Sequence, residues 1–224
     1  MYGKNEEVLH MYIKGIMPGG ISSNCYVLCD EASGEGALCD VGEYNALVEN
    51  EIKAAGIKTL KYILCTHGHF DHVYGIRDTK ERFPEAKTVI GLFDAELLHD
   101  SYKNLADAFG IVYDKNTEAD ITVTRGDVLT LGETKLRVIE TPGHSQGGVC
   151  YVCDSEKFLL SGDTIFKLTI GRTDKWGSDF DTLIESIKKL MTLPDDYKIY
   201  TGHNIPTTVG DERTGNRFSK YFNK

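Results

Sequence analysis

The chain has 224 residues, of which 41% are hydrophobic and 26% are charged, values ordinary for a globular protein that buries a sizeable core. Its net charge of -9 argues against nucleic acid as a partner, because phosphate binding needs a concentrated basic surface. No apolar run approaches the roughly 20 residues that cross a bilayer, and the acidic stretch MYGKNEEVLH lacks the pattern of a secretory signal. We therefore expect a cytoplasmic protein that acts on a small molecule, without a membrane partner; the oligomeric state is left open.

The cysteines favour a reduced, disulfide-free protein. All of them lie in apolar segments, where a thiol behaves as a small buried hydrophobe: Cys25, Cys29, Cys39, Cys65, Cys150 and Cys153. Cys150 and Cys153 have the C-x-x-C spacing, but an odd offset on a strand sends two side chains to opposite faces. A redox or zinc-knuckle role is therefore not expected for this pair.

The first half of the chain alternates short strands with helices. The segments HMYIKGI, NCYVLCD and GALCDVG are β-prone runs, and a helix is predicted over residues 45–55. The strand KYILCT follows, and FPEAKTVIGLFDAELLHD has the pattern of a strand that passes into a helix. The pattern weakens over residues 101–119, which form either a lid over a cleft or a surface insertion with Leu105, Phe109 and Ile111 packed down.

The second half of the chain also combines short strands with a helix. DITVTRGDVLTLGETKLRVIETPGHS and GGVCYVCDSEKFLLSGDT predict strands with tight turns, a helix capped by Ser178 or Asp179 follows over residues 180–191, and YKIYTGHN is a further strand. No linker or repeat divides the chain, so we expect a single domain over residues 1–224. Strands followed by a helix, twice, predict an α/β fold whose two halves pack around a shared interior.

Polar turns at the ends of the predicted strands carry histidine or aspartate. These turns contain Asp40, the string HGHFDH at residues 67–72, His144, Asp163 and His203. A strand end holds a side chain rigidly while leaving it facing a cleft, so these residues can converge on one site.

The string HGHFDH is a candidate metal site. His67 and His69 are two residues apart, so an extended backbone points both the same way and they can grip one ion. Asp71 and His72 follow after a turn and are expected to point elsewhere. One metal cannot easily take all four side chains at this spacing, whereas two neighbouring metals can share them.

Each ion then needs further ligands, and His144, Asp163 and His203 can supply them. Five histidines and two carboxylates without a thiolate suit two divalent ions, with zinc favoured and iron or manganese as alternatives. Two such ions lower the pKa of a bridging water toward neutrality and polarise the carbonyl or phosphoryl oxygen under attack. The ligand set therefore predicts hydrolysis.

A purely structural role explains the cluster less well, because three histidines and an aspartate are costly to bury without a partner. Asp163 by itself, between a glycine and a threonine, is as typical of a turn or helix cap as of a metal ligand, and its context favours the ligand. The isolated His10 and His99 are expected to be surface or hydrogen-bonded residues.

At these residues the chain resembles the metallo-β-lactamase-fold hydrolases, and within them the short bacterial glyoxalase II-like (hydroxyacylglutathione hydrolase-like) branch. The resemblance covers nearly the whole chain in the ordered set CDVG, THGHFDHVYG, ETPGHSQGGVCY, LLSGDTIF and TGHNIPTTVGDER. It implies a four-layer αββα sandwich with the site along one edge of the paired sheets.

The resemblance also implies how the ligands are shared. One metal would be held by His67, His69 and His144, the second by Asp71, His72 and His203, with Asp163 bridging the two. Asp40 would be a structural support beside the site. In IFKLTIGRTD, Arg172 would be a structural or substrate-facing residue, and Tyr74 in DHVYG is expected to narrow the pocket.

The implied activity is that of a thioesterase for S-D-lactoylglutathione or a related acyl-thiol. A hydroxide that bridges the metals would attack the carbonyl carbon, the metals would stabilise the oxyanion, and Asp71 would orient the nucleophile while it ligates. A thiolate leaves readily, so the lack of a separate candidate for the general acid favours thioesters over amides.

Several other activities share these motifs. Mononuclear iron sulfur dioxygenases of the fold, which act on glutathione persulfide, carry the same H-x-H-x-D-H string, and lactonases, β-lactamases and a non-enzymatic metal-binding protein are further alternatives. Glyoxalase II proper continues after its last histidine ligand into a helical domain that helps to hold glutathione, whereas residues 204–224 alone follow His203 here. The thiol carrier of the substrate is therefore left open.

Overall fold

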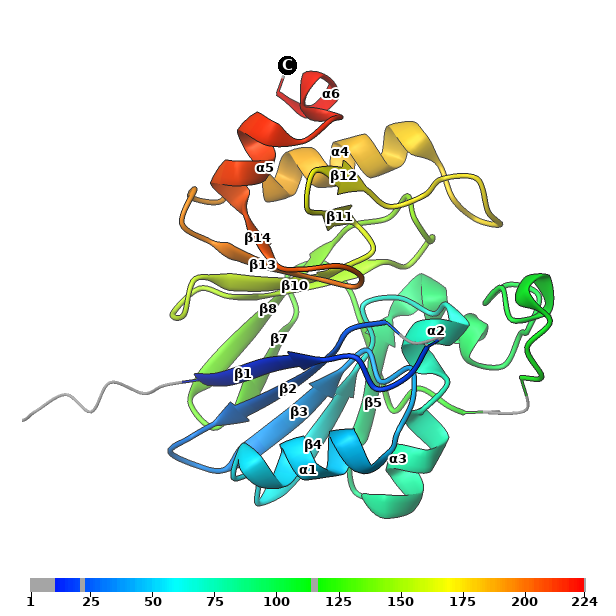
Figure 1. Ribbon diagram of the computed structural model, residues 1–224, viewed down its shortest axis with the longest axis vertical. Helices are drawn as coiled ribbons and strands as arrows, with labels where there is room; N and C mark the ends of the chain where they lie inside the picture. The colour runs from blue at the N-terminus through cyan, green and yellow to red at the C-terminus, as the bar shows by residue number, and fades with distance from the viewer. Residues whose placement is uncertain (1–10, 21–22, 114–116, 224) are drawn as a thin grey trace, which may run out of the picture.

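Two β-sheets face each other, and helices cover the outer face of each sheet (Figure 1). The computed structural model describes residues 11–20, 23–113 and 117–223. The four layers confirm the predicted αββα sandwich. Within the described residues, no helix has the length and apolar character of a membrane span.

The first sheet contains six strands in chain order. They are β1 Met11–Ile16, β2 Cys25–Asp30, β3 Glu35–Cys39, β4 Thr59–Leu64, β5 Lys87–Gly91 and β6 Ile121–Val123. The pairs from β1 to β3 are antiparallel, whereas those from β3 to β6 are parallel. The helical segments of this half are α1 Ala46–Ala54, α2 Phe70–Val73, α3 Ile76–Arg82 and the 3₁₀ helices η1 Leu92–Leu98 and η2 Asp107–Phe109.

The second sheet has the strand order β14-β13-β10-β9-β8-β7. Its strands are β7 Val128–Leu131, β8 Thr134–Glu140, β9 Val149–Cys153, β10 Phe158–Gly162, β13 Lys198–Thr201 and β14 Thr207–Thr208. A hairpin of β11 Ile165–Phe166 and β12 Thr169–Ile170 stands apart from it. The helices that cover this half are α4 Phe180–Leu190, α5 Val209–Gly215 and α6 Ser219–Phe222.

Alternation along the central strands divides the core into layers. On β9, Tyr151 and Cys153 pack between the sheets, whereas Cys150 and Val152 pack beneath α4. The C-x-x-C pair therefore faces opposite sides of the sheet, as predicted, and all six cysteines are buried and free. Both longer helices begin as the sequence indicates, since the side chain of Asn45 accepts from the Leu47 N–H and that of Asp179 from the Thr182 N–H.

The segment after β5 departs in detail from the prediction. The predicted helix is a 3₁₀ helix over Leu92–Leu98, and residues 101–113 are turns with one further 3₁₀ turn. Leu105 is buried, but Phe109 is 55% exposed, so the expectation that Phe109 is packed down was wrong. Residues 114–116 of the predicted insertion, like His10, lie outside the described residues.

Strand direction explains how distant turns meet. β3 and β4 run parallel, as do β10 and β13, and β8 is two antiparallel steps away from β10. Their carboxyl ends therefore lie at corresponding edges of the two facing sheets. Asp40, His67, His144, Asp163 and His203 each follow one of these ends within a few residues.

Candidate metal centre

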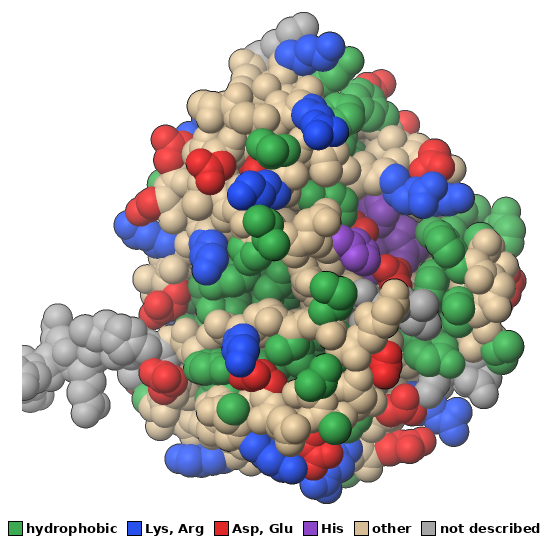
Figure 2. Space-filling model, in the orientation of Figure 1, with side chains coloured by type: hydrophobic (Ala, Val, Ile, Leu, Met, Phe, Trp, Pro, Cys, Tyr) green, Lys and Arg blue, Asp and Glu red, His purple; other side chains and the backbone are tan. Residues whose placement is uncertain are grey.

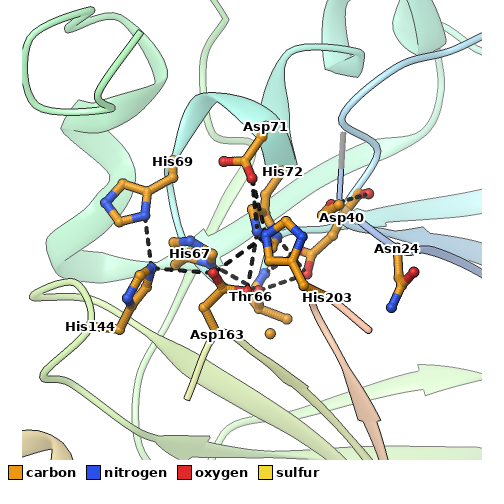
Figure 3. A network of polar contacts seen from close by, with 12 residues as sticks. Asn24, Asp40, Thr66, His67, His69, Asp71, His72, His144, Asp163 and His203 are labelled. Atoms are coloured by element: carbon orange, nitrogen blue, oxygen red, sulfur yellow. Dashed lines mark hydrogen bonds and ion pairs between the residues drawn. The ribbon is translucent and has the colours of Figure 1, made fainter. Parts of the chain in front are cut away.

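Seven predicted side chains meet at this edge of the sandwich (Figure 3). The first sheet and α2 contribute His67, His69, Asp71 and His72, and the second sheet contributes His144, Asp163 and His203. Their ligand atoms form three overlapping groups, each with all atoms within 4.8 Å of one another: His67, His69 and His144; His67, His72 and Asp163; and Asp71, His72 and His203. Residues separated by up to 136 positions (203 minus 67) are thus brought to one place.

The first group contains histidines alone. His69 Nδ1 lies 2.9 Å from His144 Nε2, and the ring of His67 stands nearly perpendicular to both neighbours, with centroids 4.6 and 4.8 Å away. His67 and His69 do point to the same place, as their spacing predicts. His72 does not point away from them, because α2 begins at Phe70 and turns His72 back until its ring centroid lies 4.1 Å from that of His67. Asp71 shares its group with His72 and His203 and not with His67 or His69.

The second group pairs histidines with carboxylates. Asp71 Oδ2 lies 3.2 Å from His203 Nε2 and 3.7 Å from His72 Nε2. Asp163 lies between the two groups, with Oδ1 at 3.4 Å from His72 Nε2 and Oδ2 at 3.5 Å from both His144 Nε2 and His203 Nε2. One carboxylate therefore faces ligand atoms of both groups.

A hydrogen-bond chain behind the site orients two of the histidines. Asp40 accepts from the Thr66 backbone N–H at 2.8 Å and from the Thr66 hydroxyl at 2.7 Å, and its Oδ2 lies 3.1 Å from His72 Nδ1. Because the single hydroxyl hydrogen of Thr66 goes to Asp40, the contact of 3.1 Å between Thr66 Oγ1 and His67 Nδ1 requires a proton on that nitrogen. His67 Nε2 is then the unprotonated nitrogen, in the form that binds a metal.

A backbone carbonyl orients His144 in the same way. Its Nδ1 lies 2.9 Å from the carbonyl oxygen of Arg172, which can only accept, so Nδ1 donates and Nε2 faces the cluster. The guanidinium group of Arg172 forms a two-pronged pair with Asp174 at 2.6 and 2.8 Å. Arg172 thus touches the site through its backbone while its side chain lines the cavity in front of it.

The donor set fits divalent metal ions. Among the described residues, His67 Nε2, His72 Nε2 and Asp163 Oδ1 are buried in the cluster without a hydrogen-bond partner, which is costly unless a ligand satisfies them. The backbone is also shaped for these side chains, because a Cβ at Gly202 would overlap the Asp163 carboxylate and lie 2.8 Å from His72 Cε1. Imidazole and carboxylate donors without a thiolate suit zinc, iron or manganese.

Burial and neighbouring charge set the protonation states of the cluster. Burial lowers the pKa of His69 to about 3, and burial together with His72 and His69 lowers the pKa of His67 well below its ordinary value. Burial alone would raise the pKa of Asp163, but His72, His144 and His203 outweigh it and lower that pKa. His67 and His69 are therefore neutral while Asp163 is ionised. At His72 and His203 the carboxylates of Asp71 and Asp163 outweigh burial and raise the pKa, so a metal there has to displace a proton.

Two supporting residues were missed from the sequence. Thr66 immediately precedes His67, and Asp94 lies in η1 after β5, where the buried carboxylate accepts from the Gly68 N–H at 3.0 Å and the Gly147 N–H at 2.6 Å. Asp94 thereby joins the loop of His67 and His69 to the loop of His144. The sequence carried a signal for both, namely a polar residue two or three positions after an apolar strand.

A cavity of about 660 Å³ opens in front of the cluster. His69, Asp71, His144, Asp163 and His203 form its floor. Figure 2 shows the histidines at the surface in a hollow on this face, with hydrophobic side chains along one side of it. Tyr74 is not among the described residues that line the cavity, and its ring lies 6.0 Å from that of Tyr113. Its expected role in narrowing the pocket stays a prediction. His99 lies elsewhere, with Nδ1 at 3.0 Å from the carbonyl oxygen of Thr117, as expected of an isolated histidine.

Several known proteins are similar to this chain in sequence and in fold. A hydroxyacylglutathione hydrolase of Bradyrhizobium sp. (strain ORS 278) is 36% identical over 178 residues, which are 80% of this chain and 61% of that relative. Among solved structures, the BLEG-1 B3 metallo-β-lactamase superposes with a TM-score of 0.87 at 32% identity, covering 93% of this chain and 99% of that one. TTHA1623 in a di-iron-bound form superposes with a TM-score of 0.79 at 27% identity, covering 92% and 99%.

A family model decides the assignment. The model described as the metallo-beta-lactamase superfamily matches residues 18–203, a range that begins before β2 and ends at the last histidine of the cluster. The chain therefore belongs to the metallo-β-lactamase superfamily, whose members are generally hydrolytic enzymes.

Proposed function

We propose that the protein is a dinuclear metal-dependent thioesterase that hydrolyses a thioester such as S-D-lactoylglutathione or a related acyl-thiol. The observation that carries the proposal is Asp163, whose two carboxylate oxygens face His72 on one side and His144 and His203 on the other. A carboxylate in this position can belong to two metal sites at once. The hydroxyacylglutathione hydrolase relative supports the choice of reaction.

His67, His69 and His144 would hold one ion, and Asp71, His72 and His203 the other, with Asp163 shared between them. Zinc is the favoured metal, with iron or manganese as alternatives, and the di-iron-bound form of the similar protein TTHA1623 supports testing iron. When bound, the ions supply a lowered pKa of coordinated water and polarisation of the substrate carbonyl.

The side chains of the protein position the reactants. Asp71 is 20% exposed and lies on the cavity floor, so its carboxylate can accept a hydrogen bond from the attacking water and orient it. The reaction breaks the C–S bond of the thioester and forms a C–O bond to the oxygen of water. The thiol leaves as a thiolate, whose conjugate acid has a pKa of about 8.5, so no protein group needs to protonate it.

Asp163→Ala tests the proposal. Removing the shared carboxylate should cost at least one metal per chain and nearly all thioester hydrolysis, measured by elemental analysis and by a hydrolysis assay with S-D-lactoylglutathione. The isosteric Asp163→Asn separates loss of ligation from loss of packing. Asp196→Ala, which removes an exposed carboxylate paired with Lys157, serves as the control.

Full activity of Asp163→Ala would contradict the proposal of a dinuclear thioesterase. A single iron per chain in the wild-type protein, with oxygen consumption, would replace it with a sulfur dioxygenase. Two metals with hydrolysis of a β-lactam or a lactone, and not of thioesters, would keep the metal centre and change the substrate.

A further inference from the structure

The cavity in front of the metal cluster has two apolar walls. One wall is formed by Phe70, Leu105, Phe109 and Ile111, and the other by Phe166 and Ile170 of the β11–β12 hairpin. The histidines and carboxylates lie on the floor between them. A volume of about 660 Å³ is enough for a ligand of drug-like size, with apolar walls and a few convergent polar groups.

The first wall is held in place by a set of hydrogen bonds. The Asn104 carbonyl accepts from the Phe70 N–H at 2.9 Å, and the buried Asn104 side chain accepts from the Ala106 N–H at 3.0 Å and donates to the Leu97 carbonyl at 3.1 Å. These bonds keep Leu105 in the left-handed region, with φ of 71°, a conformation that is costly for a bulky side chain. This wall is therefore preformed, and it includes Phe70, the residue that follows His69.

Phe109 lies at the open end of this wall. Its ring packs against that of Phe70 with centroids 5.5 Å apart, and 55% of the residue is exposed. An aromatic ring that is half exposed beside a cavity can bury further apolar surface when a ligand enters.

The charged groups of the cavity do not favour an acidic arm of a substrate. Apart from the histidines, Arg172 is the one cationic side chain among the described lining residues, and Asp174 already engages both prongs of its guanidinium group. A carboxylate on a ligand would have to compete with Asp174 for that group.

We propose that the site takes thioesters whose acyl group is an uncharged apolar chain of about four to eight carbons, and that Leu105, Phe109 and Phe166 bind this chain between the two walls. The inference rests on the proposed thioesterase function for the reaction, but it concerns binding by the walls. Each methylene buried there should strengthen binding about two- to fourfold.

Binding of non-hydrolysable analogues tests the inference separately from turnover. The probes are S-(2-oxoalkyl) derivatives of N-acetylcysteamine, in which a methylene between sulfur and carbonyl prevents hydrolysis, with acyl portions of two, four, six and eight carbons. Calorimetry on the metal-loaded protein should show Kd falling about two- to fourfold per methylene up to eight carbons. The corresponding glutathione derivative should bind no more than about twofold tighter than its N-acetylcysteamine counterpart.

Two phenylalanine variants locate the binding surface. Phe109→Ala should flatten the dependence of Kd on chain length while leaving the two-carbon probe within about twofold of wild type. Phe93→Ala, which removes an equally exposed phenylalanine (62%) that does not line this cavity, should retain the wild-type dependence.

A Kd that does not change with chain length, or no measurable binding of the six-carbon probe at millimolar concentration, would overturn the inference. Equal effects of the two phenylalanine variants would also overturn it. If Kd follows chain length but none of the matching N-acetylcysteamine thioesters is hydrolysed, the apolar binding site stands and the thioesterase function fails.

Discussion

The hydroxyl group of Thr66 links Asp40 to His67 in the hydrogen-bond chain behind the candidate metal centre. It donates to Asp40 and accepts from His67, while Asp40 also faces His72. Each histidine therefore presents a defined nitrogen to the cluster. Replacing a residue that orients a ligand in this way typically lowers metal affinity by about 10- to 100-fold.

Thr66→Val should weaken metal binding by roughly 10-fold or more, because His67 Nδ1 and one Asp40 oxygen lose their buried partner while the shape of the side chain is kept. The free energy of unfolding of the metal-free protein should also fall, by about 1–3 kcal/mol. Chelator competition and urea unfolding measure the two effects.

Thr66→Ser is the matched control, since serine keeps the hydroxyl and should retain most of the metal affinity. If valine and serine bind metal equally well, the hydroxyl does not orient His67.

At the scale of the elements, five strands deliver the site and one short 3₁₀ helix joins its two halves. η1 places Asp94 so that one carboxylate oxygen accepts from Gly68 N–H and the other from Gly147 N–H. Gly68 lies between His67 and His69, and Gly147 lies three residues after His144. The spacing of the three-histidine group therefore depends on this bridge.

Asp94→Asn should lower the affinity for the metal held by His67, His69 and His144. The amide keeps the size of the carboxylate but turns one acceptor into a donor, which then faces a backbone N–H at 3.0 or 2.6 Å. We expect a loss of about 1–3 kcal/mol in unfolding free energy and at least one metal released first on titration with a chelator.

Asp127→Asn provides the control for Asp94. Asp127 also accepts a loop N–H, from Thr124 at 2.7 Å, but it is exposed and lies away from the site. Identical metal titrations for Asp94→Asn and the wild type would show that the bridge does not position the ligands.

At the scale of the whole molecule, the candidate metal centre joins the two halves of the sandwich. Four of its side chains come from the first half of the chain and three from the second, and the sheets otherwise share the interior core that contains Leu64 and Tyr151. Metals held there connect both layers, and they have no preformed site in the unfolded chain.

Removal of the metals should therefore destabilise the entire protein. A ligand present at 1,000 times its Kd contributes about 4 kcal/mol to folding, which corresponds to a fall of roughly 10 °C in Tm for a chain of this size. Calorimetry before and after treatment with a chelator measures the change, and restored zinc should return the Tm. An unchanged Tm would mean that the ions, if bound, contribute nothing to joining the halves.

The candidate ligands and most of the elements that carry them could be predicted from the sequence. Local rules were sufficient for this: one helix begins after Asn45, where the predicted helix starts, and another at the predicted cap Asp179. Cys150 and Cys153 alternate across β9, and His67 and His69 point together. The resemblance carried by the ordered motifs added the αββα arrangement, which the two sheets confirm.

How these residues meet, by contrast, depends on the packing of the two sheets and their turns. His72 was expected to point away from His67, but one turn of α2 returns it to the cluster. The bridge of Asp94 and the apolar walls with the exposed Phe109 join segments far apart in the chain. Spacing along a chain fixes the direction of neighbouring side chains, whereas distances between segments depend on how sheets and turns pack, and that information is not local.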